Sequence, residues 1–315
     1  MPKILIIGAN GQIGTELAEA LALRHGDAAV VTGDLAPEGR IARIAHEAFD
    51  VTDAAALAAV VRRHRVTQIC HLAAALSANG EKHPQWAWNL NMGGLLNVLE
   101  LARHDRLERV FWPSSIAAFG PTTPATAAQH TVMDPSTVYG ISKLAGERWC
   151  AWYHANHRVD VRSLRYPGLI SWKTAPGGGT TDYAVEIFHA ALQERRYTSF
   201  LREDTRLPMM YMPDAIRATI ELMEAPAERV RERGSYNVGG ISFTPREIAD
   251  EIARHVPGFA LSCQPDFRQA IADSWPQVID DAQARADWGW SARFDLRAMV
   301  ADMLANLKPP PRASA

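Results

Sequence analysis

The stretch that decides the fold is Ile4-Leu5-Ile6-Ile7-Gly8-Ala9-Asn10-Gly11-Gln12-Ile13-Gly14. Four consecutive apolar residues predict a strand buried on both faces, and a helical pattern begins near Gly11. Gly8, Gly11 and Gly14 lie between these two elements. Glycine permits a tight turn there and lets backbone N–H groups approach an anion at the positive end of the helix dipole. The segment therefore predicts a phosphate-binding turn between a parallel strand and a helix.

An acidic residue follows this turn at the spacing typical of a dinucleotide-binding unit. Asp34 ends the second predicted strand, where its carboxylate can accept hydrogen bonds from both hydroxyls of an adenosine ribose. The same carboxylate would repel a 2′-phosphate, and the next residue is Leu35 rather than an arginine. We therefore expect NAD rather than NADP. Asp50 and Val51 are candidates to contact the adenine, although an N-cap role before the next helix explains Asp50 almost as well.

Strand and helix patterns alternate over the first half of the chain. Parallel strands joined by helices form a sheet that is covered on both faces, so this order predicts the α/β class with a doubly wound parallel sheet. The expected strands are 4–7, 28–32, 68–72, 109–112 and 161–165, and the expected helices begin near residues 11, 54, 89 and 137.

The second half of the chain has a less regular pattern, which predicts a smaller substrate-binding or lid lobe. A helix pattern covers 184–194. Met209-Met210-Tyr211, with a helix from Ala215, would bring the chain back to the large domain over about 206–225. We expect a large cofactor domain over 1–170, a smaller lobe over 171–307 and a disordered Pro-rich tail over 308–315.

Composition and charge exclude several other classes of protein. The formal net charge is -2, with both signs interspersed, so no basic surface for nucleic acid is expected. No segment reaches the ~18 apolar residues of a membrane span, and no signal peptide precedes the first strand. The three cysteines form no CxxC pair, which predicts buried thiols and no metal site. These features favour a cytoplasmic enzyme.

Tyr139 and Lys143 are four residues apart and therefore lie on the same face of one predicted helix. A phenol, whose pKa is ordinarily near ~10, becomes a useful base when an ammonium and a positively charged nicotinamide ring stabilise the phenolate. Taken alone, the pair could equally be a surface tyrosine beside a solvated lysine. Ser114 and Ser115 follow a predicted strand at the carboxyl edge of the same sheet, where ligands of doubly wound folds bind. Their hydroxyls are candidates to hold a substrate oxygen.

Together, the glycine turn, the serine pair and Tyr-x-x-x-Lys resemble the extended short-chain dehydrogenase/reductase family, which includes the sugar-nucleotide epimerases. The resemblance covers essentially the whole chain and implies a Rossmann sheet, Tyr139 as base and a homodimer built on the helices starting near Asn89 and Thr137. It leaves the choice of serine open, because alignment through Phe119-Gly120 favours Ser115 while the distance back from Tyr139 favours Ser114. His71 is given no chemical role. The candidate catalytic residues are thus Ser115, Tyr139 and Lys143, and the candidate cofactor-binding residues are Gly8, Gly11, Gln12, Ile13, Gly14, Asp34, Asp50, Val51, Leu72, Ala73, Ala74, Asn91, Tyr139, Lys143, Tyr166 and Pro167.

Several longer runs resemble the L-threonine 3-dehydrogenase branch of that family. This resemblance implies oxidation of the threonine hydroxyl to 2-amino-3-oxobutyrate with reduction of NAD. Gly177-Gly178-Gly179 is then a mobile lid rather than a plain connector, and Asp182 is either an ammonium ligand or, as we prefer, a helix N-cap. The runs are 166–171, 177–185, 206–211, 242–245 and 274–276, and the candidate substrate-binding residues are Ser77, Ser114, Gly179, Thr180, Thr181 and Trp275.

Two other functions fit parts of the sequence. A sugar-nucleotide epimerase or dehydratase would use the same scaffold, but the lid shows no basic cluster for a nucleoside diphosphate. A catalytically silent NAD-binding regulator would need only the glycine turn and Asp34. The presence of Tyr139, Lys143 and the serine pair argues against that reading, because binding alone does not require a phenolate.

Overall fold

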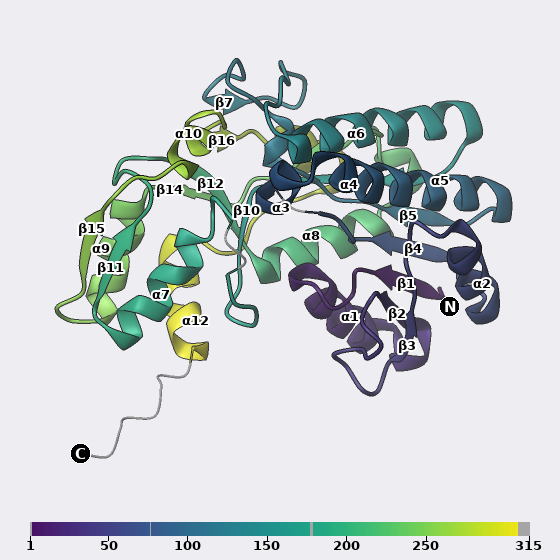
Figure 1. Ribbon diagram of the computed structural model, residues 1–315, viewed down its shortest axis with the longest axis horizontal. Helices are drawn as coiled ribbons and strands as arrows, with labels where there is room; N and C mark the ends of the chain where they lie inside the picture. Colours follow the sequence, from purple (N-terminus) through teal and green to yellow (C-terminus); the bar gives the residue numbers. More distant parts are fainter. Residues whose placement is uncertain (1, 76, 177–178, 308–315) are drawn as a thin grey trace.

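The computed structural model describes residues 2–75, 77–176 and 179–307, apart from the side chains of 77–79. The expected tail over 308–315 lies outside the described residues, as do Gly177 and Gly178 of the glycine run. Figure 1 shows a larger lobe built on a sheet and a smaller lobe that contains α7, α9 and α12. The helix α8, which follows the smaller lobe's strand β12 in sequence, lies under the large sheet.

The large lobe contains a sheet of six parallel strands in the order β3-β2-β1-β4-β5-β8. The order reverses between β1 and β4, and the carboxyl ends of all six strands lie at one edge. In doubly wound folds ligands bind at such a reversal. The predicted α/β class with a doubly wound parallel sheet is therefore confirmed. The strands are β1 Ile4–Ile7, β2 Val30–Asp34, β3 Ala45–Ala48, β4 Gln68–His71, β5 Arg109–Phe111 and β8 Val161–Arg162.

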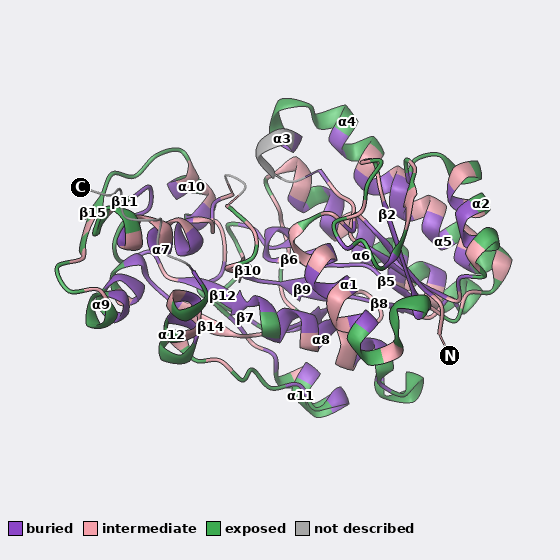
Figure 2. Cartoon of the chain, turned by 90° about the horizontal axis from the view of Figure 1, so that it is seen from below, coloured by how far each residue is buried: buried purple, intermediate pink, exposed green. Residues whose placement is uncertain are grey.

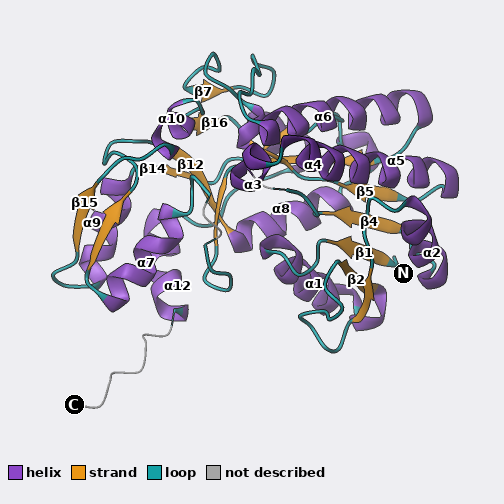
Figure 3. Ribbon diagram, viewed as in Figure 1, coloured by secondary structure: helices purple, strands orange, loops and turns teal. Residues whose placement is uncertain are grey.

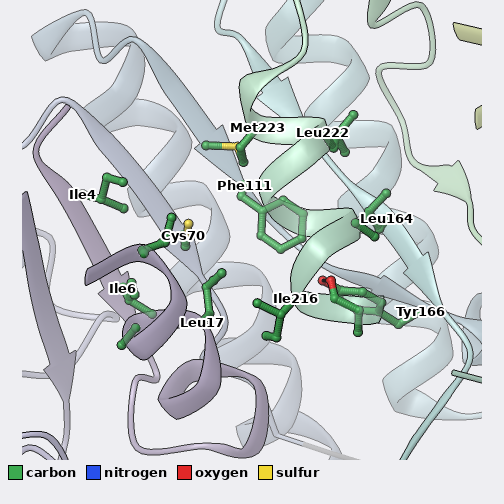
Figure 4. Close-up of a cluster of buried hydrophobic side chains, with 14 of the residues drawn as sticks. Ile4, Ile6, Leu17, Cys70, Phe111, Leu164, Tyr166, Ile216, Leu222 and Met223 are labelled. Atoms are coloured by element: carbon green, nitrogen blue, oxygen red, sulfur yellow. Dashed lines mark hydrogen bonds between the residues drawn. The ribbon is translucent and has the colours of Figure 1, made fainter. Parts of the chain in front are cut away.

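Helices cover both faces of this sheet (Figure 3). One face carries α1 and α8, whose apolar residues join Ile4, Ile6 and Phe111 in a single buried cluster (Figure 4). The other face carries α2, α5 and α6 over Leu5, Ile7 and their neighbours. Continuous apolar strands are what such two-sided burial requires. The helices are α1 Gln12–His25, α2 Ala54–His64, α5 Gly94–Asp105, α6 Val138–His157 and α8 Met212–Glu224.

Several expected elements differ in their bounds, and three of them show why. Strand β2 begins at Val30 because 27–29 form a 3-10 turn. The strand expected over 161–165 is two strands: β8 ends at Arg162, and β9, Leu164–Tyr166, pairs instead with β6, Ser114–Ser115. The helix expected near Asn89 begins at Pro84, since proline is favoured in a first helical turn. It runs as α4, Pro84–Trp88, through a π-helical turn over 89–93 into α5.

The smaller lobe has its own buried core, formed by α7, α9 and α12 against the sheet β10-β12-β14. Figure 2 shows this buried interior and the exposed outer surfaces of the helices. Met209-Met210-Tyr211 belongs to this small sheet, so only the helix after it returns to the large sheet. Cys263 is exposed on β15, contrary to the expectation of three buried thiols. The remaining elements are α3 Ser77–Lys82, β7 Thr126–Ala127, β10 Gly168–Ile170, α7 Tyr183–Gln193, β11 Arg196–Ser199, β12 Leu207–Tyr211, β13 Tyr236–Asn237, β14 Ile241–Phe243, α9 Pro245–His255, β15 Ala260–Cys263, α10 Arg268–Asp273, β16 Val278–Ile279, α11 Ala282–Trp288 and α12 Leu296–Asn306.

Candidate active site

The glycine turn after β1 is packed too tightly for any side chain. Gly8 has a φ of +78°, and a Cβ built on it would lie 2.6 Å from the backbone nitrogen of Ala73. A Cβ on Gly14 would lie 2.4 Å from the carbonyl oxygen of Gly8. Both contacts involve backbone atoms, which cannot rotate away. The turn is therefore held against the chain segment that follows β4, at the point where the strand order reverses.

The N-terminus of α1 opens at this turn. Gly11 occupies the N-cap, and no side chain of the described residues caps it. The N–H groups of the first turn are thus available to an anion, and Gln12 and Ile13 are only half-buried. Asp34 lies beside the turn, since its Oδ2 accepts a hydrogen bond from the backbone nitrogen of Asn10 at 3.0 Å. These donors and this acceptor fit the pyrophosphate and the ribose of a dinucleotide.

Helix α6 brings Tyr139 and Lys143 to the end of β5. Thr137 caps the helix by accepting a hydrogen bond from the nitrogen of Gly140. The side chain of Ser115 lies against the Tyr139 phenol, where it acts as a hydrogen-bonding group that lowers the phenol's pKa. Lys143 Nζ lies 5.4 Å from the centroid of the Tyr139 ring and donates to the carbonyl oxygen of Pro113. The structure thus brings together Ser115, Tyr139 and Lys143.

Ser114 points elsewhere. Its hydroxyl donates to Oε1 of Glu147 at 2.6 Å, and the serine is buried. Neighbouring residues on a strand face opposite sides, so only one serine of the pair can face Tyr139. The geometry favours Ser115 over Ser114 as the residue that holds a reacting oxygen.

Burial has the largest effect on the pKa values of Tyr139 and Lys143. It raises the pKa of Tyr139 to about 12, although the hydrogen bond with Ser115 opposes this shift. Burial also lowers the pKa of Lys143 to about 7. We expected Lys143 to acidify the phenol. In the protein alone the phenol has a higher pKa than usual, because desolvation disfavours its anion more than the Ser115 hydroxyl favours it.

Four residues named from the sequence have side-chain partners within the protein. The Tyr166 phenol lies in the core between the sheet and α8, where it is hydrogen-bonded to Thr219, so only its backbone can line a cofactor (Figure 4). Asn91 Oδ1 accepts from the nitrogen of Ala75, and its Nδ2 donates to the Ala75 carbonyl and to the hydroxyl of Ser142. Asp50 accepts from Thr52, and the N-cap of α2 is Asp53. Asp182 accepts from the nitrogen of Gly179 and makes no side-chain cap to α7 within the described chain.

The other candidates lie around these groups. Leu72, Ala73 and Ala74 follow β4 and are half-buried, while Val51 and Pro167 are buried. The nitrogens of His71 have no partner among the described residues, and burial lowers its pKa to about 3, in keeping with a neutral ring.

The substrate candidates are placed on both lobes. Thr180 is buried, and the Thr181 side chain packs against Gly168. Trp275 packs against the core of the smaller lobe and against a cluster that includes Ile116 and Phe119, just after Ser115. Ser77 begins α3, but its side chain lies outside the described part of the chain.

Sequence reasoning missed a buried ion pair behind the serines. Glu147 accepts two hydrogen bonds from Arg165, each of 2.8 Å. The spacing could have pointed to Glu147, because this residue is four positions after Lys143 and therefore shares its helix face. The pair lines a surface hollow of about 630 Å³ between α6 and the segments 129–133 and 232–235, and a second hollow of about 550 Å³ lies beside α7. Neither contains Tyr139.

Within residues 2–75, 77–176 and 179–307, no group of His, Cys, Asp or Glu side chains is arranged to hold a metal ion. None of the helices there combines the length and the apolar character needed to cross a membrane.

Comparisons with known proteins agree with this geometry. A family model described as the NAD dependent epimerase/dehydratase family matches residues 4–239. A protein of Staphylococcus haemolyticus, described as an uncharacterized epimerase/dehydratase, is 47% identical over 98% of both chains. The GalE-like L-threonine dehydrogenase from Cupriavidus necator in its holo form is 69% identical, with a TM-score of 0.96 over 98% of this chain and 100% of that one. A monomeric L-threonine 3-dehydrogenase from a metagenome, in its apo form, is 44% identical, with a TM-score of 0.93 over 96% and 98%.

Proposed function

The chain belongs to the NAD dependent epimerase/dehydratase family, and from that premise we propose that it oxidises the 3-hydroxyl of L-threonine to 2-amino-3-oxobutyrate with reduction of NAD. The observation that carries the chemistry is the cluster of Ser115, Tyr139 and Lys143 at the carboxyl edge of the sheet. The choice of substrate rests on the full-length similarity to threonine dehydrogenases, at 69% identity in one case.

Tyr139 is the base in this proposal. Its phenolate oxygen takes the proton of the threonine hydroxyl while C3 loses its hydrogen as hydride and the C–O bond becomes a carbonyl. NAD held by the glycine turn and Asp34 would supply the hydride acceptor and a positively charged ring that favours the phenolate. Ser115 donates a hydrogen bond to the reacting oxygen and keeps it against Tyr139. Lys143, fixed by the carbonyl of Pro113, adds its charge beside the ring.

Recognition of threonine must rest on polar contacts, because the substrate is a small zwitterion with little apolar surface. We assign the carboxylate to Gly179, Thr180 and Thr181, which lie between β10 and α7. In this proposal Trp275, which packs against Ile116 and Phe119, covers the bound substrate and excludes water. Ser77 is a further candidate for a hydrogen bond to the substrate.

The test is the formation of NADH, followed by absorbance, with L-threonine, L-allo-threonine, L-serine and a UDP-sugar in parallel. We expect the highest kcat/KM for L-threonine. Tyr139→Phe is expected to lose turnover and to bind NAD as the wild type does, because it removes only the phenolic oxygen. Activity confined to the UDP-sugar would refute the substrate, and near-normal turnover of the variant would refute the base.

We also propose that the enzyme is a cytoplasmic homodimer, since it draws on the intracellular NAD pool. Large apolar side chains are exposed on the adjacent helices α4 and α6, and a two-fold interface would bury them. Light scattering should give twice the chain mass of 34.7 kDa, and Trp152→Asp should give the single mass. A wild type of single mass, as in the monomeric relative, would contradict the dimer. The exposed residues are Trp86, Trp88, Ile141, Trp149 and Trp152.

A further inference from the structure

Helix α6 contacts the segment that carries the reacting serine at three successive positions. Tyr139 is bonded to Ser115, and Lys143 donates to the carbonyl of Pro113 at 2.5 Å. One helical turn further on, Glu147 accepts the hydroxyl hydrogen of Ser114 at 2.6 Å. The first two side chains belong to the proposed chemistry. The third touches no reacting group.

The Glu147 carboxylate is fully engaged in the interior. Its Oε1 accepts from Ser114 and from Nε of Arg165, and its Oε2 accepts from Nη2 of Arg165. The exposed fractions are 1% for Glu147, 2% for Ser114 and 5% for Arg165. A buried carboxylate with three charge-assisted hydrogen bonds has a sharply defined position, because any displacement leaves a charge unpaired in a medium of low polarity.

Arg165 transmits this position to the neighbouring strand. It lies on β9, directly across from Ser114 in the parallel pairing with β6. Its remaining nitrogen, Nη1, donates to the carbonyl of Gln129 and to Oδ1 of Asn237. The two residues of β6 are therefore clamped from α6 on one side and from β9 on the other.

The clamp also sets the direction of Ser115. Tyr139 and Glu147 lie on the same face of α6, about two turns apart, and the two serines are adjacent, so a Ser114 hydroxyl drawn toward Glu147 fixes Ser115 at the level of Tyr139. A slip or twist of β6 would move both serines together. The length of the hydrogen bond between Ser115 and Tyr139 thus depends on a carboxylate that touches neither of them.

We propose that Glu147 is a positioning residue, which acts through Ser114 and Arg165 to hold the Ser115 hydroxyl against the Tyr139 phenol. The inference rests on the proposed function for its kinetic consequence. Its geometric consequence is independent of the substrate.

The kinetic test compares Glu147→Gln and Ser114→Ala with the wild type. Displacement of the reacting geometry by about 1 Å can cost ~100-fold in rate, so we expect kcat to fall by about 10- to 100-fold. The KM for L-threonine and the dissociation constant of NAD are expected to stay unchanged, because Glu147 contacts neither. Ser114→Ala keeps the ion pair and loses one hydroxyl, so it decides the outcome if Glu147→Gln does not fold.

Asp214→Asn is the matched control. Asp214 is also a buried carboxylate, 2% exposed, with an arginine partner and two backbone N–H donors, and it lies on α8. The Asp214→Asn variant should lose thermal stability, as Glu147→Gln does, but keep the kcat of the wild type. A folded Glu147→Gln or Ser114→Ala with the kcat of the wild type would overturn the inference, as would an equal fall in kcat for Asp214→Asn.

Crystal structures of the wild type and of Ser114→Ala separate this inference from the proposed function. We expect the Ser115 hydroxyl of the variant to lie beyond hydrogen-bond distance from the Tyr139 oxygen. An unchanged hydrogen bond would overturn the positioning role, whatever the substrate is. A wild type that does not oxidise L-threonine would refute the proposed function and leave this structural comparison decisive.

Discussion

Replacing Gly14 with alanine tests how tightly the glycine turn is built, and Gly93 offers a matched control. Both glycines lie in helical backbone, and Gly93 has φ and ψ of −62° and −46°. A Cβ on Gly14 would lie 2.4 Å from the oxygen of Gly8 and 2.7 Å from Cα of Ala9, whereas a Cβ on Gly93 would meet no described atom within 4 Å. The two substitutions therefore share their effect on helix propensity and differ in their contacts.

The two substitutions should change the free energy of unfolding in opposite directions. Alanine is better than glycine in a helix by about 1 kcal/mol, so Gly93→Ala should be stabilised by about that amount. Overpacking costs ~1–3 kcal/mol, and the upper end applies at Gly14 because the opposing atoms are backbone. Gly14→Ala should thus lose about 2 kcal/mol net, or about 3 kcal/mol relative to Gly93→Ala. At ~2 °C per kcal/mol, the two melting temperatures should differ by about 6 °C.

The same overlap should weaken the binding of NAD. Pushing the turn open removes at least one N–H from the pyrophosphate, and a hydrogen bond to a charged group contributes ~1.5–3 kcal/mol. The dissociation constant of Gly14→Ala should rise by about 10-fold or more, and that of Gly93→Ala should not change. Thermal unfolding followed by circular dichroism and calorimetric titration with NAD measure both effects. The reasoning fails if Gly14→Ala matches Gly93→Ala in stability or the wild type in affinity.

Three other substitutions follow from the structure. The double substitution Asp34→Ser and Leu35→Arg removes the charge that opposes a 2′-phosphate and adds a cation at an exposed position. The kcat/KM with NADP should therefore rise relative to the kcat/KM with NAD. An unchanged ratio would argue against Asp34 as the residue that discriminates between the two cofactors. Lys143→Met should raise the free energy of unfolding at neutral pH by a few kcal/mol while abolishing turnover, because burial lowers the pKa of Lys143 from 10.5 to about 7. The native state then binds fewer protons than the unfolded state between these two pKa values, so the wild type gains stability from this group as the pH rises through that range. The benefit of the substitution should accordingly shrink between about pH 7 and pH 10.5 in urea unfolding, and a constant benefit would contradict the shift. Arg162→Met should lower the free energy of unfolding by ~3–5 kcal/mol without lowering kcat. Arg162 is fully buried and donates hydrogen bonds to three carbonyls at the end of α8 and to Asp160. A melting temperature like that of the wild type would contradict this stabilising role.

The sequence predicts well those features that depend on short-range geometry. The glycine turn needs only a strand followed by a helix, and both elements lie within one continuous segment. Tyr139 and Lys143 share a helix face because residues four apart always do. Asp34 reaches the turn because parallel strands end at one edge, and its hydrogen bond with Asn10 follows from that.

The direction in which a strand residue faces was harder to predict. The choice between Ser114 and Ser115 depends on the pairing of β6 with β9, and the two strands are about fifty residues apart in sequence. Tyr166 was expected beside the cofactor, but it alternates with Arg165, which faces Glu147, and therefore points into the core under the sheet. No local pattern reveals which partner strand a short segment will choose.

Asn91 shows a different limit. The resemblance placed it at the cofactor, whereas its side chain joins the loop after β4 to α6 through Ala75 and Ser142. It lies in the π-helical turn over 89–93, a distortion that depends on tertiary contacts and that apolar spacing does not predict. Such a residue can support the site through its side chain, and its contact with the cofactor stays a prediction.

The electrostatics of the cluster link catalysis to cofactor binding. The chain alone holds Tyr139 at a pKa of about 12 and Lys143 at about 7, so near neutral pH the phenol keeps its proton and the amine is only partly charged. A second positive charge close to the ring would favour the phenolate, and in the low polarity of the site its effect is larger than in water. Burial, which makes Tyr139 a poor base in the protein alone, therefore also makes it responsive to a charged pyridinium. Proton removal is then confined to the complex in which a hydride acceptor is already present.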